Sequence, residues 1–590
     1  MCGICGEFRF DGQLPDLARI NKMMSRLERR GPDHGGSYSD GPVAFGHRRL
    51  AIIDLSEHAN QPLIDPQSGL ALVFNGTIYN FPALRAELQA KGYHFFSSGD
   101  TEVILKAYAE WGEACVERLH GMFAFAIWDM RKQQLFLGRD RLGIKPLYYS
   151  VNNNRLLFAS NAQALLATAD VDTSINPVGL HHQLTLHAVI PAPHTILNGI
   201  QKMRPAHCMC FKADGGYAQR EYWTLKACRP AQKMDEVEWV EAIRESLKAA
   251  VEKRKTIADV PVGVLLSGGI DSCLLVALLS EAGVGNLKTF TVGFEDQPEE
   301  KGNEFEFSDQ VVDKFGTEHH KFFIRNDKVL DYLPDTVGAM AEPMVGQDAV
   351  AFYMLSEQVS REVKVVQSGQ GADEVFGGYF WYPQMHEAQG EEDLQRFASR
   401  YFDRDHEEYL QTVSGAFQGE DHTSKLISGL LAKGNADEYL DKVLRLDVTT
   451  LVVDDPVKRV DNMTMAWGLE ARVPYLDHQL VELAASMPPE MKLQSGGKHV
   501  LKKVARGRVP DAVIDRPKAY FPVPAMKYVR GEFLGFMRDI LHSDTARQRG
   551  LFQPEYVEKL LRSPERYHTR LQGSKLWHLA LLEMWLQRNV

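Results

Sequence analysis

The first part of the chain alternates between hydrophobic and polar residues, and this pattern predicts short β-strands. A turn-forming run, Asn152–Asn154, separates the last two of them. The predicted strands are Val43–Asp54, Ala71–Tyr79, Met122–Asp129, Gln134–Arg139, Leu147–Val151 and Arg155–Ser160. Helices are predicted at Asp16–Arg29, Phe81–Lys91 and Thr101–Trp111. We therefore expect an α+β domain in which helices cover antiparallel sheet.

The pattern changes near residue 235, where longer apolar segments alternate with predicted helices. The predicted strands are Val260–Leu266, Leu287–Phe294, His319–Ile324 and Val363–Gln367. The predicted helices are Asp235–Lys253, Cys273–Glu281, Phe307–Phe315 and Asp327–Met340. Repeated strand–helix units predict a parallel sheet with right-handed crossovers. From Tyr379 onward the sequence is mainly helical and charged, and we expect this region to wrap the sheet.

Two polar stretches, Lys212–Gly216 and Cys228–Gln232, separate these two patterns. We therefore predict an N-terminal domain over residues 2–210, a linker over residues 211–234 and a C-terminal domain over residues 235–590.

Composition restricts the partners and the compartment. The chain has 590 residues and a net charge of −11, with 44% hydrophobic and 25% charged residues, as in ordinary soluble proteins. The acidic balance disfavours nucleic acid and acidic membranes, so small molecules are the expected partners. No apolar run is long enough to cross a membrane, and charged residues interrupt the first 30 positions where a signal peptide would be apolar. Seven scattered cysteines suit a reducing compartment, which predicts a cytoplasmic location.

Cys2 directly follows the initiator methionine, and cysteine is small enough for that methionine to be removed behind it. The residue would then carry a thiol and a free α-amine, with pKa values of roughly 8.5 and roughly 7.7 to 8.0, which can share a proton. Cys2 is therefore a candidate N-terminal nucleophile. The alternative is an unimportant residue in a frayed terminus. A metal or redox role for the Cys2–Cys5 pair is disfavoured, because no second pair at zinc spacing follows.

Two glycine-containing loops follow predicted strands in the second part: Ser267–Ser272 and Ser368–Glu374. Backbone N–H groups at such a loop suit a phosphate, and the aspartates Asp271 and Asp373 suit an accompanying Mg²⁺. If the first and fourth parallel strands are neighbours, both loops lie at the same edge of the sheet and could contact one nucleotide. Taken alone, either loop could be a simple glycine turn.

Six short motifs in the N-terminal part together resemble the class II glutamine amidotransferase domain. They are Cys2–Ile4, Arg30–Asp33, His47–Leu50, Phe74–Gly76, Gly99–Glu102 and Gly138–Asp140. In the second part, Ser267–Ser272 resembles a pyrophosphatase-type ATP loop, while Ser368–Gly378 and Leu469–Asp477 resemble asparagine synthetase. The resemblance covers nearly the whole chain. It implies a four-layer αββα fold of the N-terminal-nucleophile hydrolase type, followed by an α/β ATP-pyrophosphatase domain with a parallel sheet and a helical C-terminal extension.

For the first part, this resemblance implies a site that cleaves glutamine. Cys2 would attack the side-chain amide and release ammonia, with Asn75 and the backbone N–H of Gly76 holding the oxyanion. Arg49 would pair with the α-carboxylate of glutamine, and Asp100 with its α-ammonium. The implied glutamine-binding residues are Arg49, Leu50, Ile53, Asn75, Gly76, Thr77 and Asp100.

For the second part, the resemblance implies a site where ATP activates a carboxylate. Leu265 and Val292 would flank adenine, Asp271 and Asp373 would bind Mg²⁺, and Lys518 would bind pyrophosphate. The other implied ATP-binding residues are Ser267, Gly268, Gly269, Ser272, Ser368 and Gly369. The acceptor carboxylate would attack the α-phosphorus, pyrophosphate would leave, and ammonia delivered through an internal tunnel would displace AMP. Without the motif, Lys518 would be a solvated surface charge. Glutamine, ATP and the acceptor are the expected partners, and a homodimer is a further expectation.

Three departures from asparagine synthetase bear on the acceptor. Thr77 stands where a glutamate is common, which removes a carboxylate but leaves the oxyanion donors. Gln370 stands in the acceptor pocket where a glutamate that could act as a base is common. The segment Glu342–Asp348 has no arginine to pair with a small dianionic acceptor such as aspartate.

Four segments resemble a narrower branch, the N-acetylglutaminylglutamine amidotransferases, which amidate a short acetylated dipeptide. They are Leu186–Pro193, Glu342–Asp348, Ser368–Glu374 and Phe380–Pro383. A larger, less charged acceptor fits the missing arginine and the aromatic residues after the second loop, although Trp381 alone would equally fit core packing. Two alternatives stay open: an asparagine synthetase with an altered aspartate pocket, and a nucleotide-binding regulator without chemistry. The intact Cys2, Asn75, Asp271, Asp373 and Lys518 disfavour the regulator.

Overall fold

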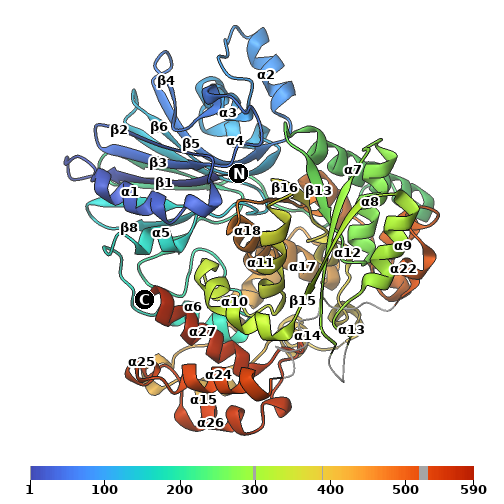
Figure 1. Cartoon of the computed structure of the whole chain (residues 1–590). Coiled ribbons are helices and arrows are strands. Elements are labelled where there is room, and N and C mark those ends of the chain that lie inside the picture. Colours follow the sequence, from blue (N-terminus) through green and yellow to red (C-terminus); the bar gives the residue numbers. More distant parts are fainter. Residues whose placement is uncertain (1, 297–300, 389, 517–528) are drawn as a thin grey trace.

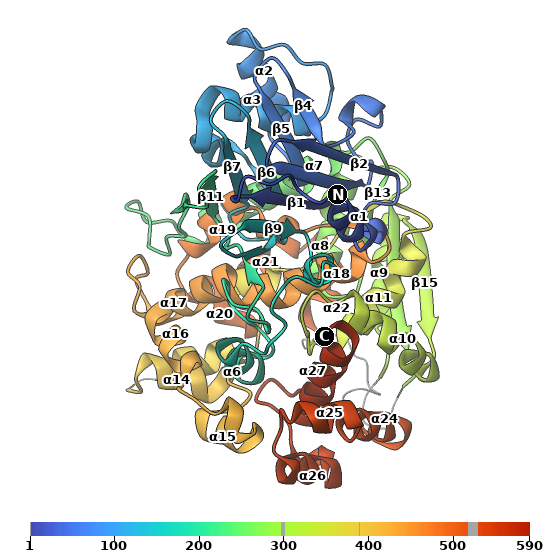
Figure 2. The ribbon, with the colours of Figure 1, turned by 90° about the vertical axis from the view of Figure 1, so that its left-hand side faces the viewer.

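The chain forms three β-sheets, of which two are antiparallel and one is parallel (Figure 1). The computed structural model describes residues 2–296, 301–388, 390–516 and 529–590. Figure 2 shows the antiparallel sheets at the top of the molecule and the last helices of the chain at the bottom.

The two antiparallel sheets lie face to face, and an apolar core fills the space between them. Side chains from both sheets meet there, including Phe8, Phe45, Val73 and Trp128. The first sheet has the order β10 (Gln201–Lys202), β8 (Tyr148–Val151), β9 (Arg155–Ala159), β1 (Cys2–Arg9), β3 (Val43–Arg49), β2 (His34–Asp40). The second has the order β12 (Tyr217–Glu221), β11 (His207–Lys212), β7 (Gln134–Arg139), β6 (Gly121–Asp129), β5 (Leu70–Ile78), β4 (Leu63–Asp65).

Helices cover the outer faces of both sheets. α1 (Leu17–Ser25) and α5 (Ala162–Leu166) pack on the first sheet, through a cluster that includes Ile20 and Ala44. α2 (Phe81–Ala90), α3 (Asp100–Trp111) and α4 (Cys115–Arg118) pack on the second, where Ile104 contacts the cluster around Phe74. The resulting αββα layers confirm the fold predicted for the N-terminal part.

The parallel sheet has the order β15 (Glu318–Ile324), β14 (Lys288–Phe294), β13 (Val262–Leu265), β16 (Val365–Gln367), β17 (Glu470–Arg472). The first and fourth strands predicted for this part, β13 and β16, are neighbours. The glycine loops that follow them therefore lie at the same edge of the sheet. One apolar cluster joins the sheet to α7 (Glu236–Thr256), α8 (Ile270–Glu281) and α9 (Phe305–Phe315). A second cluster joins it to α10 (Asn326–Ala339), α11 (Asp348–Val359) and α27 (Lys575–Asn589). The predicted α/β architecture is therefore confirmed.

The remaining helices surround this sheet or extend below it in Figure 1. They are α6 (Pro177–Thr185), α12 (Ala372–Phe376), α13 (Trp381–Glu387), α14 (Asp393–Tyr401), α15 (His406–Thr412), α16 (His422–Leu431), α17 (Tyr439–Leu446), α18 (Lys458–Met465), α19 (His478–Ala485), α20 (Glu490–Leu493), α21 (His499–Ala505), α22 (Asp511–Asp515), α24 (Gly531–Leu541), α25 (Asp544–Arg549) and α26 (Pro554–Arg562). Between α17 and α18, residues 447–451 and 453–457 are wound as π-helix.

Several predicted boundaries differ from the structure. The predicted strand Val43–Asp54 is too long, because β3 ends at Arg49 and an irregular segment follows. β1 and β17 were not predicted as strands. The polar residues 212–216, expected in the linker, form the turn of a hairpin that adds β12 to the second antiparallel sheet.

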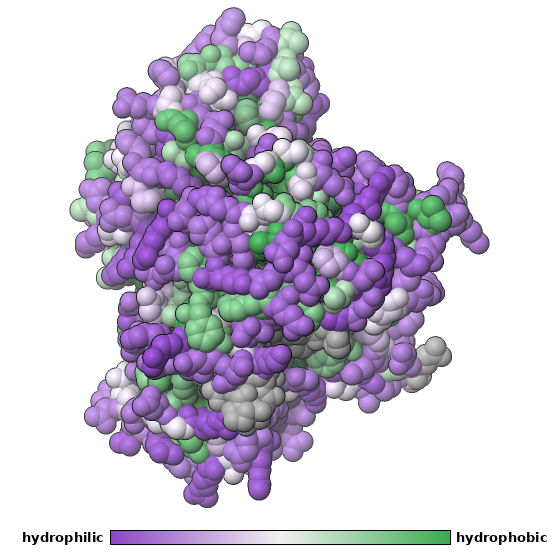
Figure 3. Space-filling view, turned by 45° about the vertical axis from the view of Figure 1, so that its right-hand side comes forward, coloured by the Kyte–Doolittle hydropathy of each residue, from purple (hydrophilic) through white to green (hydrophobic). Residues whose placement is uncertain are grey.

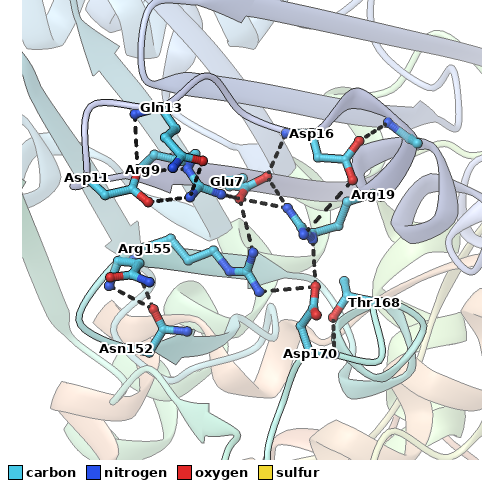
Figure 4. A network of polar contacts seen from close by, with 12 residues as sticks. Glu7, Arg9, Asp11, Gln13, Asp16, Arg19, Asn152, Arg155, Thr168 and Asp170 are labelled. Atoms are coloured by element: carbon cyan, nitrogen blue, oxygen red, sulfur yellow. Dashed lines mark hydrogen bonds and ion pairs between the residues drawn. The ribbon is translucent and has the colours of Figure 1, made fainter.

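A buried carboxylate fixes the strand that begins at Cys2 (Figure 4). Glu7 on β1 is fully buried, and both its oxygens accept hydrogen bonds from Arg19 of α1, at 2.9 and 3.0 Å. Arg155 of β9 lies 3.6 Å from the same carboxylate, and Asp170 pairs with both arginines. Three parts of the first antiparallel layer are thus joined around β1.

The face shown in Figure 3 is largely hydrophilic, with hydrophobic residues scattered among the polar ones. Within the described residues, no helix combines the length and the apolar character needed to span a bilayer.

Candidate active sites

Cys2 lies at the first position of β1, directly opposite Arg49 of β3. Its side chain is buried, and its backbone N–H donates to Oδ1 of Asn75 at 3.1 Å. Burial raises the pKa of the thiol, while the backbone of Leu50 and the charge of Arg49 act in the opposite direction. The thiol is therefore largely protonated before a substrate binds.

Asn75 and Gly76 lie on β5, beside Cys2. The side-chain Nδ2 of Asn75 is buried and has no hydrogen-bond partner among the described residues. A buried donor of this kind is costly unless something accepts from it. Gly76 packs so closely on β6 that an added Cβ would lie 2.1 Å from the carbonyl oxygen of Met122. Asn75 therefore offers an unused donor beside Cys2, and Gly76 holds β5 against β6 at that point.

The other predicted glutamine-binding residues differ in the contacts that they make. Oδ2 of Asp100 at the start of α3 accepts the N–H of Ile78 at 3.0 Å, and burial raises the pKa of Asp100 to about 6. Nη1 of Arg49 donates to the carbonyl of Ser56 at 2.9 Å and to Oδ1 of Asn60 at 2.7 Å. The guanidinium is thus held in place by the loop after β3, which also contains Leu50 (buried) and Ile53 (half-buried).

Thr77, the departure next to the oxyanion pocket, contacts the other half of the chain. Its hydroxyl donates to Oε1 of Glu470 on β17 at 3.4 Å. Burial alone would raise the pKa of Glu470, but Arg472, whose Nε lies 2.5 Å from it, outweighs this and holds the pKa at about 2. Thr77, which stands where a glutamate is common, thus contacts a carboxylate of the C-terminal part. Glu470 lies in the motif Leu469–Asp477, but the sequence alone gave it no role.

The two glycine loops meet at the carboxyl edge of the parallel sheet. The first connects β13 to α8, and the hydroxyls of Ser267 and Ser272 lie 3.1 Å apart within it. The second connects β16 to α12, and a Cβ added to Gly369 would lie 3.1 Å from the Cβ of Asp271. Gly268 has φ +80°, a conformation that glycine adopts without strain. One ligand can therefore contact both loops.

Asp271 and Asp373 both pair with Lys498, a residue that the sequence alone did not identify as part of the site. Nζ of Lys498, at the start of α21, lies 2.6 Å from Asp271 and 2.8 Å from Asp373. Burial opposes the charge, but the two carboxylates raise the pKa of Lys498 above its usual value. Two carboxylate groups that already converge on a positive charge form a donor set that fits Mg²⁺. The position of Lys498, after two glycines and before a helix, was the available signal in the sequence.

A cavity of about 420 Å³ extends from the two loops. Predicted residues line it, namely Leu265, Ser267, Gly269, Asp271, Ser272, Val292, Ser368, Gly369, Gln370 and Asp373. Arg516 also lines it and pairs with Glu304 at 2.9 Å. Lys518 lies outside the described residues.

Beyond Gln370 the cavity wall is acidic and aromatic. Trp381 lines it and stacks on Tyr379 with ring centroids 4.2 Å apart, so the side chain both packs and faces the cavity. The segment Glu342–Asp348 has no arginine of its own, but Arg459 of α18 lies against it, 3.0 Å from Asp348. Arg459 also pairs with Asp455, so its charge is already balanced.

His187 lines the same cavity from the segment that follows α6. His187 and Ala188 have φ values of +54° and +60°, which is unfavourable for residues other than glycine. Nδ1 of His187 lies 3.0 Å from the buried carboxylate of Asp403, which also lies 3.4 Å from His578. Burial lowers the pKa of His187, but Asp403 outweighs it, so that the net shift is upward.

Buried ion pairs join the two parts of the chain. Arg30 and Lys145 of the N-terminal part pair with Asp461 at 2.9 and 3.1 Å. Lys202 pairs with Glu342 and Asp454, each at 2.8 Å. A small cavity of about 10 Å³ lies between these groups.

Comparison with known proteins agrees with this two-site geometry. Residues 1–223 match the glutamine amidotransferase domain family, and residues 242–587 match the asparagine synthase family. A relative from Bacillus subtilis (strain 168), named asparagine synthetase (glutamine-hydrolyzing) 3, is 31% identical over 100% of this chain and 98% of its own. This chain belongs to the asparagine synthetase family.

Two further proteins are similar to this chain over most of its length. Asparagine synthetase B (glutamine-hydrolyzing) of Escherichia coli (strain K12) is 30% identical over 88% of this chain and 82% of its own. A protein of Gibberella zeae named Amidase chry2 is 28% identical over 86% of this chain and 85% of its own. This chain is accordingly a glutamine-hydrolysing, asparagine synthetase-like amidotransferase, a ligase that consumes ATP and forms AMP and pyrophosphate.

Proposed function

We propose that this enzyme converts the terminal carboxylate of an acetylated dipeptide, N-acetylglutaminylglutamine, into an amide. The observation that carries the proposal is the wall of the cavity beyond Gln370, where the described residues are mainly aromatic and acidic and Arg459 is already paired with Asp348 and Asp455. A small dianion such as aspartate would meet uncompensated negative charge there.

The acidic groups of this end suit amides better than carboxylates. Burial raises the pKa of Asp348, and it raises the pKa of Asp447 well above its usual range, aided by the charge of Glu374. Carboxyl oxygens at this end can accept hydrogen bonds from the amide N–H groups of the acceptor. Trp381 and Tyr379 offer apolar faces to an extended, uncharged chain. His187, oriented by Asp403, offers a further polar contact at the cavity wall.

In the N-terminal part, we assign the cleavage of glutamine to Cys2. Once Met1 is removed, the nitrogen of Cys2 that donates to Asn75 would be a free α-amine. It would take the thiol proton as sulfur attacks the amide carbon and pass it to the leaving nitrogen, which gives ammonia and a glutamyl thioester; water would then hydrolyse the thioester to glutamate. The free Nδ2 of Asn75 and the N–H of Gly76 would stabilise the oxyanion. Arg49 and Asp100 would bind the two charged groups of glutamine, with Leu50, Ile53 and Thr77 completing the pocket.

In the C-terminal part, we assign ATP binding to the two loops, with Leu265 and Val292 beside adenine. Asp271 and Asp373 would hold Mg²⁺, which supplies charge neutralisation for the phosphates when bound. Lys498 would then be released from these carboxylates and could pair with the leaving pyrophosphate, together with Lys518. Gln370 would contact the acceptor.

We further propose that ammonia passes between the sites inside the protein. The small cavity between the joined parts is about large enough for one molecule of this size. We also propose that the chain divides into two domains joined by a linker. The boundary lies later than the predicted residue 210, because β11 and β12 form a hairpin of the second antiparallel sheet and the two family matches leave residues 224–241 between them.

A second candidate is asparagine synthesis from aspartate, because relatives named asparagine synthetase match nearly the whole chain. One assay distinguishes the two candidate functions. Glutamine-dependent formation of AMP and pyrophosphate is measured with N-acetylglutaminylglutamine, with aspartate and with neither. We expect turnover with the dipeptide at least about tenfold above that with aspartate, a difference of about 1.4 kcal/mol in the barrier. Turnover with aspartate alone would reject the dipeptide, and no turnover with any acceptor would favour a regulator.

A further inference from the structure

Helix α6 lies beside α15 and α16 (Figure 2). Histidines from these elements come together where they meet. Nε2 of His181, on α6, lies 3.1 Å from Nδ1 of His406, the first residue of α15. The same Nε2 lies 3.8 Å from Oδ1 of Asp421, which precedes α16. The three ligand-type atoms all lie within 4.8 Å of one another.

These separations match those in a tetrahedral metal site. With bonds of roughly 2.0 to 2.1 Å, two ligands of a tetrahedral Zn²⁺ lie about 3.3 Å apart. The observed 3.1 and 3.8 Å bracket this value, so an ion would need only small side-chain movements. Two imidazole nitrogens and one carboxylate are a donor set that favours Zn²⁺ and its neighbours over Mg²⁺ or Ca²⁺.

A second layer of contacts orients His181. Its Nδ1 lies 2.7 Å from the hydroxyl of the buried Thr423, which also lies 2.9 Å from Nδ1 of His182. The hydroxyl can accept from His181 and donate to His182. In that arrangement the lone pair of His181 is on Nε2, directed at His406. Metal-binding histidines are typically held by such a hydrogen bond from the other ring nitrogen.

The exposure of the group also suits a metal. His406 and Asp421 are partly exposed, which gives an ion a route into the site.

We propose that His181, His406 and Asp421 form a Zn²⁺-type binding site, with water as the fourth ligand. The bound ion would clamp α6 to α15 and α16. Because α6 leads directly into the segment that carries His187 to the acceptor cavity, the clamp would stiffen one wall of that cavity. This proposal does not depend on the identity of the acceptor.

The test uses the full-length protein after treatment with a chelator. Zn²⁺ binding is measured by titration calorimetry and by metal analysis after dialysis, and Co²⁺ is added as a spectroscopic probe. We expect one tightly bound equivalent, a visible Co²⁺ spectrum of four-coordinate intensity, and a rise of a few degrees in Tm.

Two variants remove ligands with little risk to the fold. His406→Ala removes a partly exposed ring. Asp421→Asn removes the carboxylate but keeps the oxygen that accepts the N–H of Ser424 at 2.9 Å and caps α16. Each variant should bind Zn²⁺ at least tenfold more weakly and lose the Co²⁺ spectrum.

His320→Ala is the matched control, because His320 belongs to another group of metal-ligand type, with Glu318 and Glu362 on the surface. We expect this variant to bind Zn²⁺ as the unaltered protein does. Absence of binding by the unaltered protein, or unchanged affinity in both His406→Ala and Asp421→Asn, would overturn the proposal.

Discussion

At the residue scale, the environment of Cys2 explains how a weakly acidic thiol could act as a nucleophile. Burial disfavours the thiolate, so the sulfur of Cys2 carries its proton until the reaction begins. The neighbouring amine can accept the proton during the attack itself, when the developing charge moves to the oxyanion. Among the described residues, Nδ2 of Asn75 has no partner, so it could receive that charge. The proposed nucleophile, base and oxyanion donor thus belong to two residues, Cys2 and Asn75, joined by one hydrogen bond.

Replacing Cys2 with alanine should separate the two activities. Glutamine-dependent synthesis should fall by about 10³-fold or more, because no other group in the pocket can form the thioester. Synthesis with added ammonium chloride should persist, since the ATP site is untouched. Product formation with each nitrogen source measures both. Cys5→Ala, a buried cysteine on the same strand, is the control and should keep glutamine use. Full glutamine-dependent synthesis by Cys2→Ala would refute the assigned nucleophile.

The pH dependence of glutamine use should reflect Asp100. Burial raises the pKa of this carboxyl to about 6, so it is charged above that pH and increasingly neutral below it. The neutral form cannot pair with the α-ammonium of glutamine. We therefore expect kcat/KM for glutamine hydrolysis to fall as the pH drops below about 6.

Asp100→Asn provides the matched comparison. It should lower kcat/KM by about 10- to 100-fold and remove the titration near pH 6. A titration that persists unchanged in Asp100→Asn would assign it to another group.

At the element scale, the short strand β17 contacts both candidate sites. It pairs with β16, which leads into the second ATP loop, and Glu470 reaches Thr77 beside the glutamine pocket. Arg472 on the same strand also donates to the carbonyls of Arg254 and Ile257, at 2.6 and 2.7 Å. Glu470 thus links the two halves of the chain, while Arg472 anchors β17 to the end of α7 within the C-terminal half.

Replacing Glu470 with glutamine should be strongly destabilising. The change leaves the buried guanidinium of Arg472 without its counter-charge, which typically costs about 3 to 5 kcal/mol. Urea unfolding measures the free energy of unfolding. Lys328→Gln, which breaks the exposed pair with Asp331, should leave it unchanged. Equal stability of Glu470→Gln and the unaltered protein would show that the pair contributes nothing.

The elements also show what the sequence could and could not predict. Strands such as β5 and β6 were predicted because their residues are largely apolar. The neighbouring positions of β13 and β16 were a condition of the two-loop interpretation, and the structure meets it. β1 was missed because Cys2, Gly3 and Gly6 interrupt its pattern, and β17 because it has three residues. Glu470 and Lys498 gain their roles from partners distant in sequence, 393 and 227 positions away. The local pattern of hydrophobic and polar residues carries no information about contacts between such distant positions.

At the scale of the whole molecule, the two parts meet through charges of opposite sign. The N-terminal part contributes Arg30, Lys145 and Lys202, and the C-terminal part contributes acidic partners that include Asp461 and Glu342. These groups are almost fully buried. Buried pairs of this kind specify one relative placement, because a shifted interface would leave charges unpaired.

Replacing Asp461 with asparagine should loosen this interface. Two buried cations lose their shared counter-charge, so Tm should fall and ammonia should escape before reaching the second site. The ratio of glutamate to AMP formed, close to one in a coupled enzyme, should rise.

Asp33→Asn is the control, because Asp33 also crosses between the parts but pairs with Lys364 at a solvent-exposed position. Its ratio should stay unchanged. A ratio that also stays unchanged in Asp461→Asn would show that these ion pairs do not seal the path.

The hydrogen bond from the backbone nitrogen of Cys2 to Asn75 has a practical consequence for anyone who produces this protein. An affinity tag fused ahead of Cys2 would keep its nitrogen an amide, which cannot accept a proton. The last residue, Val590, is 46% exposed and leaves room for an appended sequence. We therefore expect a protein tagged at Val590 to use glutamine, and one tagged ahead of Cys2 to depend on added ammonia.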